Sequence, residues 1–460
     1  MPIELTNRRA LVLGLGASGL SMARWLNARG ASVRVADSRE APPFAAQLRS
    51  ELPAIDMHAG AFRSESFADV DLIAISPGVP MAEPLVRDAV KRGVEVVGDI
   101  ELFARIRDEY PGNRVIAITG SNGKSTVTEM AGAMVRAAKI RTLIAGNIGL
   151  PILDALLEVQ AGTRRRPDVF VLELSSFQLE STRSLNPDAA AVLNLSEDHL
   201  DRYSGMPGYA DAKARIFIGD GIQVVNRQDD WARGMVGPGR KVFTFGLDEP
   251  WNEGNWGMRD IEGELWLAEG RANLMKVSEL KVAGLHNAAN ALAALALCRA
   301  IRLPYEPLLD ALFKFEGLPH RVQKVAEVEG VTFYDDSKGT NVGATVAALM
   351  GMTSGVVLIA GGEGKGQDFS SLRDAVAKKA KGVVLIGRDS DKIAAALEGS
   401  GVAMIHAASM QEAVQAGFSM AQPGDAVMLS PACASFDMFR NYEHRAEVFV
   451  EAVRALKGGK

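Results

Sequence analysis

Short apolar runs rich in β-branched residues recur along the chain, and several lead directly into a glycine-containing turn. Three examples are Ala10–Leu13, Val115–Thr119 and Val356–Ala360. Unbroken apolar runs of this length are typical of strands that are buried on both faces of a parallel sheet. Stretches of helical composition follow the first two runs, to Ala28 and over Val127–Lys139. The pattern therefore predicts an α/β protein.

The strand-then-glycine pattern appears once in each third of the chain, at Gly14, Gly120 and Gly361. A chain of 460 residues is too long for a single core. We expect three domains over 1–102, 103–317 and 318–460, of which the first and last are Rossmann-like and the central one has a P-loop ATPase-type parallel sheet. Further strands are expected at 32–37, 71–75, 93–98, 141–147, 168–173, 188–195, 331–335, 383–387 and 426–431, with short β runs within 240–283.

The first glycine loop reads Gly14-x-Gly16-x-x-Gly19 and is followed by Asp37 at the end of the next strand. Taken alone, this spacing is typical of a nicotinamide dinucleotide site. The physical requirement is close approach of backbone to a diphosphate, and a uridine diphosphate meets it equally well.

The central loop reads Thr119-Gly-Ser-Asn-Gly-Lys-Ser-Thr126 between a strand and a helix. Glycines let backbone N–H groups approach an anion, and the helix N-terminus adds partial positive charge. Ile118 stands where the full phosphate-binding pattern has its first glycine, so the loop is a shortened one. The alternative is a structural turn with a solvated lysine, but the flanking elements favour phosphate binding.

Carboxylates and a histidine follow the central loop at strand ends. Glu173 ends a predicted strand, where a P-loop enzyme holds its second metal-binding acid. Glu197, Asp198 and Asp201 surround His199. Ordinary surface or packing roles remain open for both groups, and Ser196 could simply cap a helix. Nothing in the periodicity distinguishes Lys213.

Composition excludes several classes of protein. The formal net charge is −5, which argues against bulk attraction to nucleic acid or an anionic membrane. Cys298 and Cys433, its two cysteines, cannot make a disulfide framework or a four-thiolate metal site. We reject a signal peptide at Arg8-Arg9, because the following residues complete a strand–turn–helix unit, and no apolar run is long enough to span a membrane. A cytoplasmic protein is expected.

Eight sequence blocks resemble the Mur ligases of peptidoglycan synthesis over essentially the whole chain, and Gly98–Phe103 and the last two blocks are similar to the branch that adds D-glutamate. The blocks are Thr119–Thr126, Gly146–Gly149, Leu172–Leu179, Glu197–Tyr203, His286-Asn287, Gly317–Arg321, Asp336–Lys338 and Leu429–Ser435.

The resemblance implies an ATP-dependent ligase of cytoplasmic peptidoglycan precursor synthesis. It implies transfer of D-glutamate to UDP-N-acetylmuramoyl-L-alanine through an acyl phosphate and a tetrahedral intermediate. Implied ATP contacts are Gly120, Ser121, Asn122, Gly123, Lys124, Ser125, Thr126, Asn147, Asn287, Asn290, Arg321 and Asp336. Two Mg²⁺ ions are implied, held by Ser125, Glu173, His199 and Lys213 carried as a carbamate. Implied substrate contacts are Ser18, Ser38, Arg39, Gly78, Lys338, Thr340, Lys365, Ser435 and Phe436. Implied catalytic residues are Lys124, His199, Lys213 and Lys338.

Three alternatives stay open at the level of sequence. The first is a nicotinamide oxidoreductase, and the second is a P-loop switch without ligase chemistry. The third is another Mur ligase or a folylpolyglutamate synthase. A monomer that binds neither nucleic acid nor membrane is expected. The residue that deprotonates the incoming amine is not evident, although His199 is a candidate if no metal occupies it.

Overall fold

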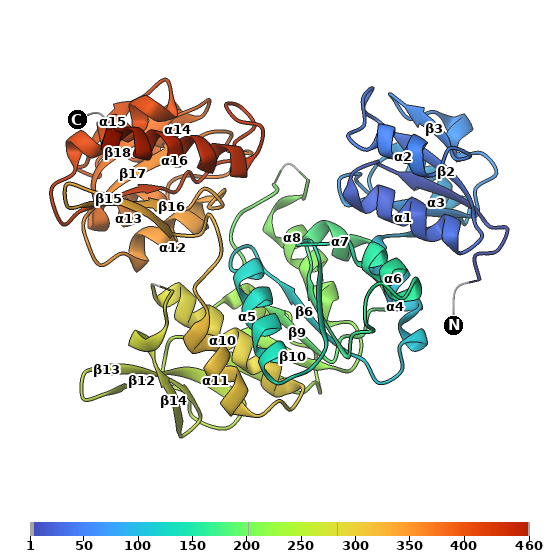
Figure 1. Cartoon of the computed structure of the whole chain (residues 1–460), viewed down its shortest axis with the longest axis horizontal. Helices are drawn as coiled ribbons and strands as arrows, with labels where there is room; N and C mark the ends of the chain where they lie inside the picture. The colour runs from blue at the N-terminus through green and yellow to red at the C-terminus, as the bar shows by residue number, and fades with distance from the viewer. Residues whose placement is uncertain (1–3, 201, 283, 459–460) are drawn as a thin grey trace.

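The computed structural model describes residues 4–200, 202–282 and 284–458, so Asp201 of the acidic cluster lies outside it. In this part of the chain, the strands form three separate sheets, each covered by helices (Figure 1). The predicted α/β class with three parallel-dominated sheets is confirmed.

The first sheet is entirely parallel, in the order β3-β2-β1-β4-β5. Its strands are β1 Arg9–Leu13, β2 Ser32–Asp37, β3 Asp56–Ala59, β4 Leu72–Ile75 and β5 Glu95–Val97. Its helices are α1 Ala17–Ala28, α2 Ala45–Glu51, α3 Pro84–Lys91 and the 3₁₀ turn Ser64–Phe67. The helix α4 (Asp99–Arg105) and the 3₁₀ turn Arg107–Glu109 lead into the next sheet.

The central sheet has the order β14-β13-β12-β11-β10-β9-β6-β8-β7. It is parallel from β7 to β12 and ends in an antiparallel extension. Its strands are β6 Arg114–Thr119, β7 Thr142–Gly146, β8 Val169–Glu173, β9 Ala189–Val192, β10 Ile222–Asn226, β11 Val242–Phe245, β12 Asn255–Ile261, β13 Glu264–Glu269 and β14 Ala272–Lys276. Its helices are α5 Lys124–Ala137, α6 Ile152–Gln160, α7 Ser176–Glu180, α8 Gly205–Ala214, α9 Asp230–Gly234, α10 Leu285–Ala300 and α11 Tyr305–Lys314, with 3₁₀ turns at Arg215–Phe217 and Val277–Glu279.

The third sheet has the order β15-β16-β20-β17-β18-β19, with only β15 antiparallel to its neighbour. Its strands are β15 Gln323–Val328, β16 Val331–Asp335, β17 Val356–Gly361, β18 Ala380–Ile386, β19 Ala403–His406 and β20 Ala426–Leu429. Its helices are α12 Val342–Gly351, α13 Leu372–Lys379, α14 Ser390–Ala396, α15 Met410–Met420 and α16 Tyr442–Gly458.

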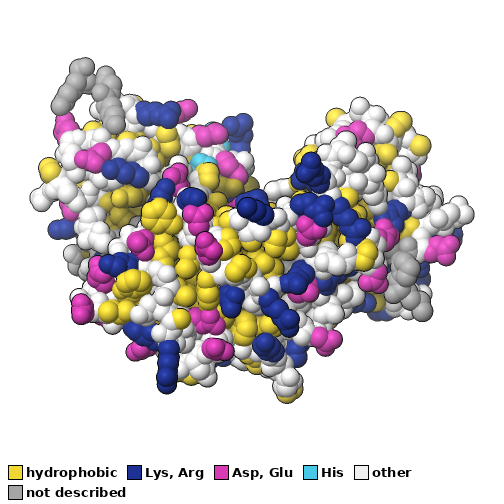
Figure 2. Space-filling view, turned by 60° about the horizontal axis from the view of Figure 1, so that its bottom comes forward, with side chains coloured by type: hydrophobic (Ala, Val, Ile, Leu, Met, Phe, Trp, Pro, Cys, Tyr) yellow, Lys and Arg dark blue, Asp and Glu magenta, His cyan; other side chains and the backbone are white. Residues whose placement is uncertain are grey.

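The three sheets make three bodies, with the first and third on either side of the central one (Figure 1). The space-filling view shows two lobes above the central part, with the surface hollowed between them (Figure 2). Buried apolar side chains fill each body. Trp25 packs in the first, Trp256 in the second and Phe449 in the third, all with 0% exposure. None of the described helices is long and apolar enough to cross a membrane. The domain boundaries remain predictions.

Glycines set the geometry of the first loop. Gly14 has a φ of +82°, and a Cβ on Gly19 would lie 1.9 Å from the Gly14 carbonyl oxygen. Only glycine therefore lets the start of α1 approach β1 this closely.

One predicted helix boundary was wrong, and four strands were missed. The helix after the phosphate loop begins at Lys124 rather than Val127, so the lysine belongs to its first turn. The strands β3, β10, β15 and β19 were not predicted. The four residues of β3 alternate polar and apolar side chains at a sheet edge and contain no apolar run.

Candidate active site

A cleft lies where the carboxyl ends of the central strands face the start of the third body. It is lined by the phosphate loop, by Asn147 and Glu173, by Asp198 and His199, and by four side chains of the third body: Arg321, Lys338, Thr340 and Lys365. Ligands of open α/β sheets collect at this end of the strands. The structure thus brings together in one place predicted residues from strands that are far apart in sequence.

The phosphate loop is held from both sides. The backbone N–H of Asn122 donates to Asn194 Oδ1 at 2.9 Å, and the side chain of Asn194 donates back to the Asn122 carbonyl at 3.1 Å. Gly123 has a φ of +82°, and a Cβ there would lie 2.5 Å from Asn290 Oδ1. These hydrogen bonds and the positive φ of Gly123 fix the loop conformation just before the N-terminus of α5, where an anion can bind.

The side chain of Lys124 is folded back over the loop. Its Nζ donates to the carbonyls of Gly120 and Ser121, both at 2.8 Å. Burial lowers the pKa of Lys124, although Glu173 and Asp198 oppose the change. A cation in this position can stabilise phosphate oxygens that lie over the loop.

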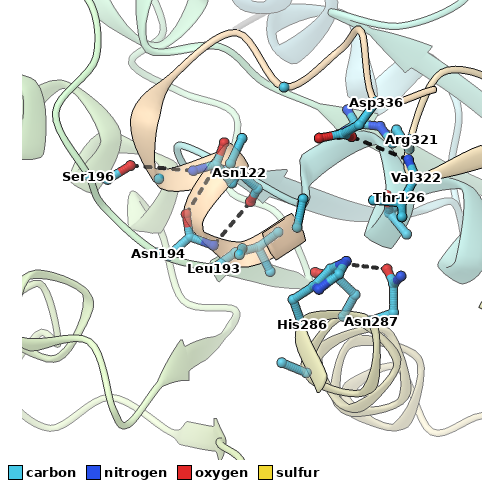
Figure 3. Close-up of a pocket in the computed structure, with 18 of the residues that line it drawn as sticks. Asn122, Thr126, Leu193, Asn194, Ser196, His286, Asn287, Arg321, Val322 and Asp336 are labelled. Carbon is cyan, nitrogen blue, oxygen red and sulfur yellow. Dashed lines mark hydrogen bonds between the residues drawn. The ribbon is translucent and has the colours of Figure 1, made fainter. Parts of the chain in front are cut away.

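A second cavity, of about 330 Å³, adjoins the loop (Figure 3). Its walls carry Asn122 and Thr126, Asn287 and Asn290 from α10, and Arg321 and Asp336 from the third body. Burial raises the pKa of Asp336 to about 7, against a 2.6 Å hydrogen bond from the Ser430 hydroxyl and the nearby charge of Arg321. The cavity offers amide and carboxyl groups beside apolar walls, as a nucleoside requires.

Glu173 and Ser125 provide oxygen atoms on the cleft floor. Glu173 is 2% exposed, and its Oε1 accepts a 2.8 Å hydrogen bond from Asn147. Its Oε2 is buried and has no hydrogen-bond partner within the described residues. A buried carboxylate oxygen without a donor suits a cation. Among the same residues, no group of three His, Cys, Asp or Glu side chains could hold a metal alone. The donor set therefore fits Mg²⁺, which takes few protein ligands and completes its shell with phosphate and water.

Lys213 is 1% exposed, and its Nζ donates to the Gly120 carbonyl at 2.9 Å. It also contacts Thr119 Oγ1 at 3.3 Å and lies 4.6 Å from the centre of the Tyr209 ring. The amines of Lys213 and Lys124 thus converge on the same carbonyl oxygen. Burial, and then the charge of Lys124, lower the pKa of Lys213 far below its usual value.

His199 has a φ of +56° and lies among aromatic rings. Its ring centre is 4.7 Å from that of Phe177, and its Nε2 is 3.6 Å from Asp198 Oδ2. Asp198 in turn accepts a 3.0 Å ion pair from Lys365 of the third body. The histidine lines the same cleft as Glu173.

Lys338 lies over the ring of Tyr442, with its Nζ 3.6 Å from the ring centre. Burial, and then the charge of Arg321, lower the pKa of Lys338 to about 8. Thr340 lines the cleft beside it. Ser435 and Phe436, the other two residues predicted at this end, are not among the cleft-lining residues. Ser435 is buried, whereas the side chain of Phe436 is 71% exposed, so their roles stay predictions.

The four predicted residues of the first body lie around its glycine loop, away from the cleft. Ser18 is in the first turn of α1, Ser38 and Arg39 follow β2, and Gly78 follows β4. They share the carboxyl edge of the first sheet. None of the described residues that line the cleft comes from this body.

Asp37, the acid of the dinucleotide fingerprint, is turned towards its own loop. Its Oδ2 accepts hydrogen bonds from the Leu15 N–H at 2.6 Å and from Arg39 at 2.6 Å. Burial raises the pKa of Asp37, but the hydrogen bonds from Arg39 and Leu15 outweigh it and lower the value to about 2. The carboxylate is thus occupied, whereas a dinucleotide site would offer it to a ribose.

Sequence reasoning missed several cleft residues, notably Asp198 as the partner of Lys365, and Asn341, His320 and Tyr442. Asn341 donates to Asn122 Oδ1 at 3.1 Å across the two bodies. Tyr442 opens α16, seven residues after the Ser435 block. The signal in the sequence that could have identified Tyr442 was an aromatic residue next to Glu443, in a segment to which no role had been assigned.

Comparison with protein families gives three matches that together follow the chain. Residues 8–98 match the Mur ligase MurD-like N-terminal domain, residues 118–298 the Mur ligase middle domain, and residues 320–433 the Mur ligase glutamate ligase domain.

Individual relatives are similar along their whole length. The UDP-N-acetylmuramoylalanine–D-glutamate ligase of Thiobacillus denitrificans is 59% identical, over 99% of this chain and 98% of the relative. The protein of the same name from Chromobacterium violaceum is 52% identical, over 100% of both chains.

Solved structures agree on the fold. MurF from Acinetobacter baumannii superimposes with a TM-score of 0.62 at 20% identity, over 96% of this chain and 93% of that one. The UDP-N-acetylmuramate–alanine ligase MurC of Thermotoga maritima gives a TM-score of 0.60 at 18% identity, over 97% and 99%. With three family matches in chain order and relatives above half identity from end to end, the chain belongs to the Mur ligase family.

Proposed function

We propose that this protein joins D-glutamate to UDP-N-acetylmuramoyl-L-alanine at the expense of ATP, in the synthesis of peptidoglycan precursors in the cytoplasm. The observation that carries the proposal is the 59% identity, over 99% of the chain, to a relative named UDP-N-acetylmuramoylalanine–D-glutamate ligase. The cleft supports it, because a nucleotide cavity, a phosphate loop and a cationic wall are contiguous there.

ATP would lie with its base and ribose in the cavity between α10 and Asp336 and with its phosphates over the loop. Asn287, Asn290, Arg321 and Asp336 would hold the nucleoside end. Lys124 would turn from the loop carbonyls to bind the β- and γ-phosphates. Arg321, which donates to Ser125 Oγ at 3.0 Å, would lie beside it. The loop N–H groups would stabilise charge that grows during phosphoryl transfer.

Mg²⁺, when bound, would neutralise phosphate charge and polarise the γ-phosphoryl group. Ser125 and Glu173 would hold one ion, and His199 with Lys213 a second. The buried and unpartnered Glu173 Oε2 supports the first assignment.

Lys213 would act as a carbamate formed with CO₂. Only a neutral amine adds to CO₂, and the fully buried position and the neighbouring Lys124 favour the neutral form. Carbamylation would also replace the repulsion between two ammonium groups on Gly120 by an attraction, and it would supply a hard anionic oxygen ligand.

The uridine end of the substrate would bind at the glycine loop of the first body, beside Ser18, Ser38, Arg39 and Gly78. Its L-alanyl carboxylate would reach the γ-phosphate in the cleft, and the resulting acyl phosphate would be attacked by D-glutamate. Lys338, Thr340 and Lys365 would receive the carboxylates of D-glutamate, with Ser435 and Phe436 nearby. We propose a monomer as the working unit.

The proposal is tested by omitting one substrate at a time. ATP, UDP-N-acetylmuramoyl-L-alanine and D-glutamate together should give one product whose mass equals the UDP substrate plus one glutamate residue. Each omission should abolish that product. Saturable NADH binding at the Gly14 loop without any response to the UDP substrate would instead favour an oxidoreductase.

A further inference from the structure

The Gly317–Arg321 segment contains an imidazole whose role the preceding assignments leave open. Nδ1 of His320 lies 2.7 Å from Oδ2 of Asp335. Asp335 is 1% exposed, and its other oxygen accepts a 2.9 Å hydrogen bond from the Ser337 N–H. Because a carboxylate only accepts, Nδ1 carries the proton and Nε2 is left with a lone pair. In other enzymes, a buried carboxylate that accepts a hydrogen bond from Nδ1 orients a histidine that acts as a general base.

The backbone holds this imidazole on the cleft wall. His320 has a φ of +62°, in the left-handed region, and its N–H donates to Gln323 Oε1 at 3.1 Å. Its carbonyl accepts a 3.2 Å hydrogen bond from the Lys338 N–H. A strained conformation kept by flanking hydrogen bonds is typical of functional sites. His320 lines the cleft, and because Nδ1 is bound to buried Asp335, Nε2 is the ring nitrogen left to act on a ligand there.

The same wall carries the cation assigned to the amino-acid substrate. The ring of Tyr442 lies near both groups: its centre is 6.1 Å from that of His320 and 3.6 Å from Lys338 Nζ. An amino acid whose carboxylate pairs with Lys338 would therefore have its ammonium group within the region that the His320 ring borders.

We propose that His320 is the base that deprotonates the ammonium group of D-glutamate, with Asp335 as its positioning residue. This inference rests on the proposed function. Nε2 takes one of the three ammonium protons, and the freed lone pair forms the C–N bond to the acyl phosphate carbon. The C–O bond to phosphate then breaks, and its electron pair leaves with the phosphate. A second proton passes from nitrogen to that phosphate, the third stays on the amide, and His320 releases its proton to solvent.

The charged and titratable groups around the imidazole come from three elements. The neighbouring groups are Arg321 before β15, Asp335 at the end of β16, Lys338 after β16, and Tyr442 and Glu443 at the start of α16.

The decisive variant is His320→Gly, because glycine adopts a φ of +62° without strain and leaves room for an added base. Hydroxylamine is an uncharged nucleophile near neutral pH and needs no base, so it traps the acyl phosphate directly. His320→Gly should form hydroxamate from ATP and UDP-N-acetylmuramoyl-L-alanine within about threefold of wild type. Its kcat with D-glutamate should fall about 10²–10⁴-fold, the range for loss of a general base. Added imidazole should restore part of that rate, and Asp335→Asn should lower it about tenfold.

His406→Gln is the matched control, because His406 also lies near an aspartate, Asp391, but its side chain is 52% exposed on β19. It should change neither reaction. Equal loss of hydroxamate and amide formation in His320→Gly without imidazole rescue would overturn the proposal, and so would a wild-type rate with D-glutamate. Absence of hydroxamate with the wild-type enzyme would instead contradict the proposed ligase function itself.

Discussion

The amine of Lys213 occupies a position that disfavours an ammonium ion. It is 1% exposed, and the Gly120 carbonyl that it contacts at 2.9 Å is shared with Lys124. Two positive charges cannot share a buried site without a compensating anion. The site is therefore arranged for a modified lysine or for a neutral one, and activity measurements separate the two.

Lys213→Ala should be almost inactive, and a short carboxylic acid such as acetate should partly restore activity by supplying the missing oxygen atoms. Depletion of CO₂ should slow the wild type and leave the variant unaffected. Lys91→Ala, whose side chain is 75% exposed, is the control. Full activity of a metal-loaded enzyme whose Lys213 is unmodified by mass spectrometry would contradict the carbamate.

Asp336 makes the folded state less stable as pH rises, whereas an acid in a salt bridge makes it more stable. Its pKa is about 7 in the folded chain and about 3.8 in the unfolded one. The folded state therefore binds more protons between these values, and its stability falls as pH rises from about 4 to about 7. Asp336→Asn should abolish this loss of stability. The free energy of unfolding of the variant, measured relative to that of the wild type, should therefore rise by about 1–4 kcal/mol between about pH 4 and about pH 7.

Urea unfolding at pH 4.5, 6 and 7.5 measures the difference. Asp391→Asn is the control, because the side chain of Asp391 is 95% exposed. If the stability difference between Asp336→Asn and wild type stays constant over this pH range, Asp336 titrates at the same pH in the folded and unfolded states, which would contradict the prediction.

At the scale of elements, most of the fold could be predicted because it is encoded locally. Each strand–glycine–helix unit needs only an apolar run, a turn that glycine permits and a helix start, all adjacent in sequence. Of the missed strands, β3 lacks that signal, since it is a partly exposed edge strand that is defined by its pairing with β2. β12 and β14 also lack a complete strand–glycine–helix unit, so the sequence predicted them only as short β runs within 240–283, without bounds of their own.

The candidate site was less predictable, because its parts meet through tertiary contacts. Nothing in the helical pattern of α8 indicates that Lys213 is buried against the phosphate loop, and the assignment depended on family resemblance. Asp198 and Lys365 pair at 3.0 Å although 167 residues separate them. Phe436 was assigned from its motif; its side chain is exposed and is not among the residues that line the cleft, whereas Tyr442 is, so the role of Phe436 stays a prediction.

The first glycine loop gives a test at this scale. Gly19→Ala should destabilise the first body by several kcal/mol, because the new Cβ would lie 1.9 Å from the Gly14 carbonyl oxygen. Gly16→Ala is the matched control, since no atom lies within 4 Å of its added Cβ. Differential scanning calorimetry should show a lowered first transition for Gly19→Ala alone. Equal transitions in both variants would contradict the close packing of α1 on β1.

At the scale of the whole molecule, the cleft depends on contacts between separate bodies. Arg321 reaches Ser125 at 3.0 Å, Asn341 reaches Asn122 at 3.1 Å and Lys365 reaches Asp198 at 3.0 Å. The first body joins through Arg202, which donates to the Pro77 carbonyl at 3.0 Å. Because the proposed substrate would extend from the first body to the cleft, the proposed reaction requires all three bodies to be placed together.

Ligand binding should therefore change the shape of the molecule, with linkers near Leu102 and Gly317 acting as hinges. Small-angle scattering should give a smaller radius of gyration with a non-hydrolysable ATP analogue and the UDP substrate together than with neither. Each ligand alone should have a smaller effect. Superimposable profiles in all four states would contradict closure.

The central claim is that the cleft couples ATP consumption to the addition of one particular amino acid. The most direct measurement is the rate of phosphate release with UDP-N-acetylmuramoyl-L-alanine and a panel of L- and D-amino acids. We predict rapid release with D-glutamate and at least about a hundredfold less with L-glutamate and the others, because buried charged groups left unpaired by the wrong enantiomer cost several kcal/mol. Phosphate release that is independent of the amino acid, or fastest with another one, would contradict it.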